Sequence, residues 1–160
     1  MSGEPREPIL TEITERPIAV QDVAALFQQD EAAGVFGAEV FFGGIVRARN
    51  AAKNVIAISY DAFVPLAETV LREIATEARM KALAGEEGEV RIIALHRIGK
   101  LHVGEVSLVI GVGAAHREQA YGASRYILEE IKTRLPVWKK EHYDSGEADW
   151  LKGHPLGRER

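Results

Sequence analysis

The chain has 160 residues, which is enough for one domain with a substantial hydrophobic core. Its formal net charge is −4, and proteins that bind nucleic acids usually carry a broad basic face, so the charge argues against DNA or RNA as the main partner. The sequence contains no cysteine, which excludes a thiol nucleophile, a persulfide, a zinc–thiolate site, an iron–sulfur cluster and any disulfide.

The cysteine-free composition fits a reducing cytoplasm. The first eight residues lack the apolar core of a signal peptide, and no apolar run reaches the length of a membrane span. We therefore expect a cytoplasmic protein with no membrane partner.

The first half of the chain predicts one helix followed by two strands. Helical apolar spacing predicts a helix over residues 20–29. A strand is predicted over residues 35–47, and Gly43-Gly44 within it indicates a bulge or the close approach of another backbone. A second strand over residues 55–63 would form a hairpin with the first. Its alternation predicts one shared face for Ile56, Ile58 and Tyr60.

The second half of the chain continues with a long helix that Pro65 opens and Gly85 ends. The later elements are a strand over residues 89–96, a turn-rich segment over 97–104, a strand over 105–113, a helix over 116–134 and an extended segment over 137–143. Pro136 prevents the last helix from continuing.

The predicted order of elements is α-β-β-α-β-β-α-β. Strands that occur in adjacent pairs favour an α+β fold with a mixed or antiparallel sheet over a doubly wound parallel fold. Residues 1–8 and 152–160 are polar and contain proline and glycine, so we interpret them as flexible tails around a single domain over residues 9–151.

Four cations surround a Pro-Val-Trp corner between the last helix and the last strand: Lys132, Arg134, Lys139 and Lys140. Cations gathered at one bend of an acidic protein indicate a local anion site. Two neighbouring ammonium groups also depress each other's pKa, which suits proton transfer near neutral pH. Trp138 would pin the backbone at this corner. The alternative is that the helical cations complement the helix macrodipole and the strand lysines are solvated.

His116 and Arg117 stand where a helix follows a strand. Backbone N–H groups at a helix start attract anions, whereas the macrodipole disfavours cations there. A bound phosphate would remove that conflict. The alternative is that Arg117 pairs with Glu118 or Glu89 and that His116 is a partly buried polar residue.

The other polar candidates carry a weaker signal. Arg47 and Arg49 follow a glycine-bearing strand, and arginine forks suit phosphate and carboxylate groups, although an ordinary exposed loop is the alternative. His96 and His102 have no carboxylate at ligand spacing, and His142 and His154 lack partners, so we expect no metal site. No nucleotide-binding loop is found, and we expect no cofactor.

Taken together, these segments resemble the large, catalytic subunit family of molybdopterin synthase over residues 37–150. The matching pieces are Phe42-Gly43-Gly44-Ile45-Val46-Arg47 with Asn50, Tyr60-Asp61-Ala62-Phe63, His96-Arg97-Ile98-Gly99, Gly104-Glu105, Ala115-His116-Arg117, and Lys132-Thr133-Arg134 with Pro136 and Trp138-Lys139. Each piece is short, but their order and spacing are specific.

The resemblance implies an α/β-hammerhead-type fold with an added α+β subdomain. It implies sulfur transfer to cyclic pyranopterin monophosphate, which forms the dithiolene of molybdopterin. The sulfur would arrive as the C-terminal thiocarboxylate of a small ubiquitin-like subunit that ends in Gly-Gly. The family assembles as a homodimer with one small subunit at each end, a heterotetramer. A non-catalytic binding module for a phosphorylated small molecule or a ubiquitin-like tail is the alternative, and a structural dimer scaffold is a second.

The resemblance also implies roles for individual residues. Lys132 and Lys139 fall on the two catalytic lysines of the family. The substrate-binding positions would be Arg47, His116, Arg117, Arg134 and Lys140. The glycines at 43–44 and at 111 or 113 would leave room for the partner's tail. One departure from the family is that no glycine follows shortly after Asn50.

Overall fold

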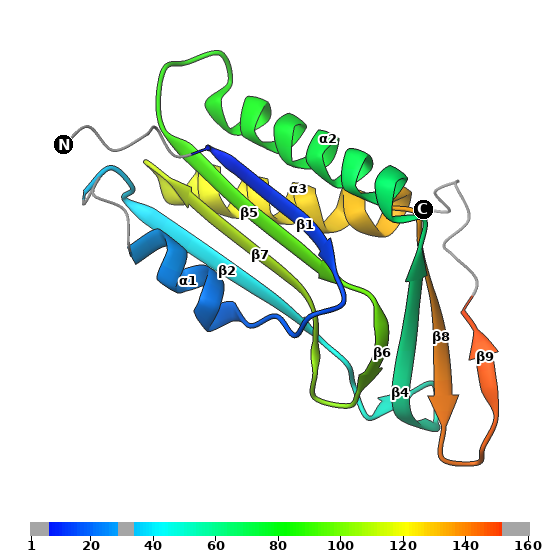
Figure 1. Cartoon of the computed structure of the whole chain (residues 1–160). Coiled ribbons are helices and arrows are strands. Elements are labelled where there is room, and N and C mark those ends of the chain that lie inside the picture. The colour runs from blue at the N-terminus through cyan, green and yellow to red at the C-terminus, as the bar shows by residue number, and fades with distance from the viewer. Residues whose placement is uncertain (1–6, 29–33, 152–160) are drawn as a thin grey trace.

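The computed structural model describes residues 7–28 and 34–151, and within them the chain forms two β-sheets and three helices (Figure 1). In chain order the elements are β1 (Ile9–Thr14), α1 (Val20–Gln28), β2 (Ala38–Ile45), β3 (Arg49–Asn50), β4 (Lys53–Ala62), α2 (Val64–Leu83), β5 (Val90–Arg97), β6 (Gly99–His102), β7 (Val106–Ala114), α3 (Arg117–Arg134), β8 (Val137–Tyr143) and β9 (Ala148–Trp150).

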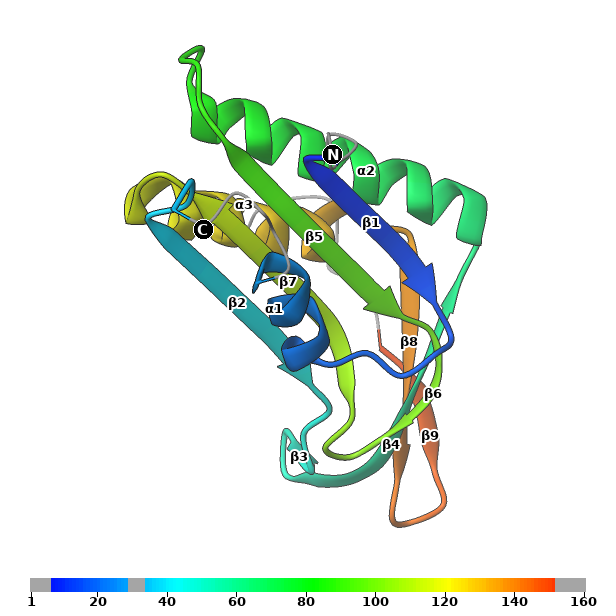
Figure 2. The same ribbon diagram turned by 60° about the vertical axis from the view of Figure 1, so that its left-hand side comes forward.

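The first sheet has the strand order β1-β5-β7-β2. Strand β1 runs parallel to β5, and the other pairs are antiparallel, so the sheet is mixed, as the sequence predicts. Helix α1 covers one face, and α2 and α3 cover the other (Figures 1 and 2). Covered faces on both sides explain why β7 is buried along nearly its whole length: Val109 packs under α1, whereas Ile110 packs under α2 and α3.

The second sheet stands beside the first and is built around β4, which pairs with β8 on one side and with β6 on the other. The small β3 pairs with the start of β4, and β9 pairs with β8. Its inner face buries a separate cluster around Leu101, Ile58 and Tyr143. Figure 2 shows this sheet extending below the helical layer, with the β3–β4 turn at its lower end.

Two predictions about the strands are wrong. The strands over 35–47 and 55–63 do not form a hairpin, because β2 pairs with β7 and β4 lies in the other sheet. Ile56 does not share a face with Ile58 and Tyr60, because a register shift between Val55 and Ala57 turns Ile56 outward, where it is 50% exposed.

Other differences concern short strands. The sequence does not indicate β1, β3 or β9, and the segment predicted as turn-rich contains β6. Strands β3 and β9, of two and three residues, carry too few alternating positions to stand out from loops, and the buried positions of the six-residue β1 do not alternate. The predicted tail over residues 152–160, and most of the one over 1–8, lie outside the described residues. The extent of a single domain over residues 9–151 stays a prediction.

Candidate active site

A buried corner connects the end of α3 to the start of β8. The backbone N–H of Leu135 donates to Ile131 O at 3.1 Å and closes the helix, and the N–H of Val137 donates to Leu135 O at 2.8 Å. Leu135 is 8% exposed and packs in the main core, with Val137 against it. Trp138 is 53% exposed, so the expectation that it pins the corner is wrong, and the aliphatic side chains on either side of the proline do so instead.

Lys132 and Lys139 leave this corner from two different elements, as predicted. Lys132 lies in the last turn of α3, and Lys139 is the third residue of β8. Both side chains are exposed, and neither forms an ion pair with any residue that the structure describes. Lys139 stands opposite Tyr60 in the antiparallel register of β4 and β8. Two unpaired cations on a rigid corner are available to an anionic ligand.

Arg134 is engaged by neighbouring acids. Its Nη2 lies 2.8 Å from Glu77 Oε2 on α2, and its Nε lies 3.4 Å from Glu130 Oε2. The Tyr126 hydroxyl donates to the same Glu77 oxygen at 2.7 Å, which raises the pKa of Tyr126 to about 12. The hydrogen bond from Arg134 holds the pKa of Glu77 below its usual value. These contacts favour a structural role between α2 and α3, and substrate binding by Arg134 stays a prediction.

His116 and Arg117 lie at the other end of α3, next to a capped helix start. Gln119 accepts the backbone N–H of His116 at 3.1 Å and donates its own amide to Ala82 O at 3.1 Å. Arg117 is 82% exposed, and its Nε lies 3.9 Å from the equally exposed Glu118. Such a pair contributes little to stability, so the Arg117 guanidinium can reach a ligand.

One copy of the chain does not bring all the predicted residues together. Arg117 and Lys132 are separated by about 22 Å along the axis of α3, at 1.5 Å per residue. The start of β2 lies beside the end of β7 that leads into α3, so Arg47, just past the other end of β2, also lies far from His116. The predicted substrate-binding residues Arg47, His116 and Arg117 therefore do not come together within a single chain.

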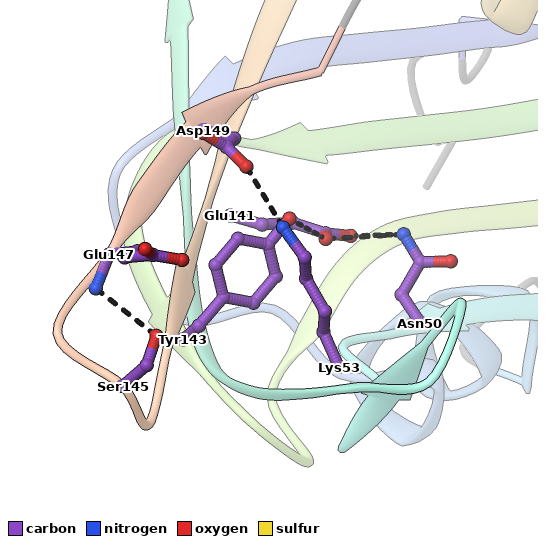
Figure 3. A network of polar contacts seen from close by, with 7 residues as sticks. All are labelled: Asn50, Lys53, Glu141, Tyr143, Ser145, Glu147 and Asp149. Atoms are coloured by element: carbon purple, nitrogen blue, oxygen red, sulfur yellow. Dashed lines mark hydrogen bonds and ion pairs between the residues drawn. The ribbon is translucent and has the colours of Figure 1, made fainter.

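A polar network surrounds Glu141 and is not predicted from the sequence (Figure 3). Glu141 is only 4% exposed, and its carboxylate accepts Asn50 Nδ2 at 2.9 and 3.1 Å and the Tyr143 hydroxyl at 2.9 Å. Lys53 Nζ lies 3.2 Å from Asp149 and 4.5 Å from the centre of the Tyr143 ring. The signal that could have revealed it is strand alternation, which places Glu141 on the inward side of β8.

Two further interpretations need correction. His142 has a partner, because its Nε2 lies 2.7 Å from Ser59 Oγ, whereas His154 lies outside the described residues. Three of the strand glycines, Gly43, Gly111 and Gly113, do not leave room for a partner's tail, whereas at Gly44 an added Cβ would make only ordinary contacts and the expectation stays a prediction. A Cβ atom at Gly43 would lie 2.9 Å from a Val20 side-chain carbon, and the other two sites are filled in the same way by side chains of the chain itself. At Gly111 these are Val23, Phe27 and Phe41, and at Gly113 they are Phe27 and Phe36.

Within residues 7–28 and 34–151, no group of three or more His, Asp or Glu side chains could hold a metal ion. None of the helices in this part of the chain is long and apolar enough to cross a membrane.

Comparison with known proteins shows the family to which the chain belongs. The family model described as MoaE protein matches residues 13–134. The molybdopterin synthase catalytic subunit of Synechococcus elongatus is 42% identical over 149 residues, which are 93% of this chain and 86% of that protein.

Solved structures agree with this match. The crystal structure of molybdopterin synthase from Staphylococcus aureus superposes with a TM-score of 0.75 at 30% identity, covering 88% of this chain and 96% of that one. A complex of subunits 1 and 2 of molybdopterin-converting factor from Helicobacter pylori has the same fold, with a TM-score of 0.70 at 20% identity and 92% of both chains covered. The chain therefore belongs to the MoaE family of molybdopterin synthase catalytic subunits, enzymes of molybdenum cofactor biosynthesis.

Proposed function

We propose that this chain transfers sulfur to cyclic pyranopterin monophosphate and so forms the dithiolene of molybdopterin. The sulfur comes from the C-terminal thiocarboxylate of a small ubiquitin-like subunit that ends in Gly-Gly. The observation that carries the proposal to individual residues is the pair of exposed lysines, Lys132 and Lys139, held by the buried corner between α3 and β8. The chain has no cysteine, which fits sulfur that arrives on a partner. The proposed location is the cytoplasm.

The lysines and the arginines have separate tasks in this reaction. Lys132 and Lys139 orient the thiocarboxylate and move protons as its sulfur attacks the pterin side chain. Arg47, His116 and Arg117 hold the phosphate and stabilise the charge that develops when the cyclic ester opens. Exposed guanidinium groups suit this task because their planar forks match phosphate oxygens.

A second copy of the chain completes the site in this proposal. The lysine corner and the His116–Arg117 pair lie at opposite ends of α3, so they can act on one substrate only if they come from two copies. A homodimer with one small subunit at each end meets this need. The Helicobacter pylori structure is a complex of two subunits, and we extend a two-subunit arrangement to this chain as part of the proposal.

A single-turnover assay tests the proposal. The purified chain would be mixed with cyclic pyranopterin monophosphate and a thiocarboxylated Gly-Gly-ended partner, and the dithiolene product would be oxidised to a fluorescent pterin and measured. Wild type should form product, and Lys132→Ala should lower the rate by about 100-fold or more, the range for loss of a group that transfers protons. Lys132→Arg keeps the charge but not a titratable amine, and it should also be slow.

The outcomes separate the proposal from its rivals. Equal turnover by wild type and Lys132→Ala would remove the proton-transfer role of the lysine. Partner binding without product from wild type would establish the non-catalytic binding module, since that module needs only the charge of Lys132. A structural scaffold would show neither partner binding nor stabilisation by the substrate.

A further inference from the structure

The arginine segment, residues 47–49, is anchored at both ends. On its N-terminal side, Val46 is 3% exposed, its N–H donates to Glu105 O at 3.0 Å, and its carbonyl accepts the N–H of Gly104 at 2.9 Å. On its C-terminal side, Asn50 bonds to Glu141, which lies 91 residues away in sequence. The segment between these anchors carries Arg47 and Arg49, both exposed.

The anchor at Asn50 is built from a buried charge. Glu141 is 4% exposed, and its hydrogen bonds come from the uncharged Asn50 and Tyr143; no cation among the described residues pairs with it. A buried carboxylate is unfavourable unless its hydrogen bonds are satisfied. Loss of the Asn50 amide would remove two of the three contacts, so the buried carboxylate strongly favours a conformation that keeps Asn50 in place.

The turn that follows Asn50 is strained. Ala51 and Ala52 have φ values of 45° and 67°, in the left-handed region where the alanine Cβ crowds the following carbonyl oxygen. Asn50 pairs with Lys53 across this turn, so it is a two-residue hairpin loop of the kind that normally contains glycine. The positive φ values of this loop are the physical reason to expect a glycine shortly after Asn50, as in the family. A strained turn persists only where its surroundings hold it.

Three side-chain hydrogen bonds, called ties below, hold this hairpin against the β8–β9 hairpin (Figure 3 shows two of them). They are Asn50 to Glu141, Lys53 to Asp149 at 3.2 Å, and Asn54 Nδ2 to Asp144 Oδ2 at 2.8 Å. The last two are exposed and contribute little, so the buried tie is the strong one. It ends on Glu141, two residues from Lys139 on the same side of β8.

We propose that Asn50 and Glu141 are positioning residues, which hold the arginine segment in a fixed relation to the strand that carries Lys139. This inference rests on the proposed function, because it assigns the arginine segment to the phosphate of the substrate. The strained alanine turn and the buried carboxylate then act together: the turn brings Asn50 over Glu141, and the hydrogen bonds keep the turn and the arginines from relaxing away.

Four variants test this role against a purely stabilising one. Asn50→Ala removes the tie, Ala52→Gly relieves the turn, the double variant does both, and Lys53→Ala is the matched control that removes an exposed tie from the same hairpin. The melting temperature Tm, the KM for cyclic pyranopterin monophosphate and kcat would be measured with saturating thiocarboxylated partner.

Asn50→Ala should lower Tm and raise KM about tenfold through weaker binding of the phosphate, and it should also lower kcat, because the displaced Arg47 stabilises less of the charge that develops in the reaction. Ala52→Gly should raise Tm by about 2–4 °C without changing KM. The double variant should regain Tm near that of wild type but keep the raised KM, and Lys53→Ala should match wild type in KM. Recovery of KM together with Tm in the double variant, or a wild-type KM for Asn50→Ala, would overturn the positioning role.

A measurement without turnover keeps the inference distinct from the proposed function. The amide of Val55 donates to Ala48 O at 2.9 Å and so reports the placement of the arginine segment by hydrogen exchange. Its protection should fall in Asn50→Ala and in the double variant but not in Lys53→Ala. Unchanged protection of the Val55 amide in Asn50→Ala would overturn the inference, whether or not wild type makes molybdopterin. A wild type that makes no molybdopterin would count against the proposed function alone.

Discussion

Lys139 and Lys140 are consecutive in β8, yet their side chains leave opposite faces of the second sheet. Lys139 is on the face that Glu141 and Tyr143 share. Lys140 is on the outer face, where its Nζ lies 5.5 Å from the centre of the Trp150 ring on the neighbouring strand. The two lysines therefore do not line one side of the same site, which argues against the substrate-binding role that the resemblance implies for Lys140.

This arrangement predicts unequal effects for two otherwise similar substitutions. Lys139→Ala should lower the single-turnover rate by about 100-fold or more, because it removes a group proposed to transfer protons. Lys140→Ala removes a cation–π contact on the outer face of the sheet and should change the rate by less than about threefold. The Lys140 variant is the matched control for net charge. Equal losses in both variants would contradict the separation of the two faces.

Complementation between inactive variants is expected if the site is shared by two copies. Lys132→Ala and Arg117→Ala change residues at opposite ends of α3 and should each be nearly inactive as homodimers. A mixed dimer contains one site with both substitutions and one site with neither, so mixing after subunit exchange should restore about a quarter of wild-type activity for random pairing. Single-turnover assays before and after exchange would measure this gain, and no gain despite confirmed exchange would place both residues in one copy's site.

The sequence predicts the long elements well, because they carry many periodic positions. The apolar stripe of α2 and the buried run of β7 are recognisable from spacing alone. The pairing of strands is not recognisable from spacing, because β2 and β4 lie in different sheets through contacts with β7 and β8, which are distant in sequence. The lysine corner could be predicted because a proline that follows a helical run, as Pro136 does, prevents the helix from continuing.

Other parts of the site depend on geometry that no local pattern carries. The hydrogen bond between Asn50 and Glu141 joins residues 91 positions apart, and neither residue stands out in the sequence by itself. The distance between Arg117 and Lys132 follows only when α3 is known to be continuous between them. The strand glycines show the converse. Their positions in the strands are evident from the sequence, but the side chains of α1 that fill the space beside them are known only from the packing of the helix on the sheet.

The surroundings of two glycines, Gly111 under α1 and Gly122 on the exposed side of α3, predict opposite effects of substitution by alanine. At Gly111 an added Cβ would lie 2.7 Å from Val23 and 3.0 Å from Phe27, both buried, so Gly111→Ala should cost about 1–3 kcal/mol through overpacking. At Gly122, on the exposed side of α3, nothing lies within 4 Å, so Gly122→Ala should stabilise by up to about 1 kcal/mol. Urea unfolding would measure both, and a stable Gly111→Ala variant would show that α1 can shift away from the sheet.

Buried His96 predicts a loss of stability in mild acid. It is 7% exposed, its Nδ1 lies 2.9 Å from Arg97 O, and its ring packs edge-on against Tyr60 with centroids 5.5 Å apart. Burial lowers the pKa of His96 to about 4 from an ordinary 6.5. Between these values the unfolded chain binds a proton that the folded chain does not, so stability falls as the pH drops from 6.5 towards 4.

The expected loss from this one group is about 3 kcal/mol across the window, and it is complete below the lower pKa. Urea unfolding at several pH values between 4 and 7 would measure it, and His96→Gln should flatten the curve. His142 has a pKa lowered by burial and by Lys100 and Lys140, so it contributes in the same direction, and His142→Gln serves as the comparison. A curve equally steep for wild type and His96→Gln would show that the pKa of His96 is not lowered in the folded protein.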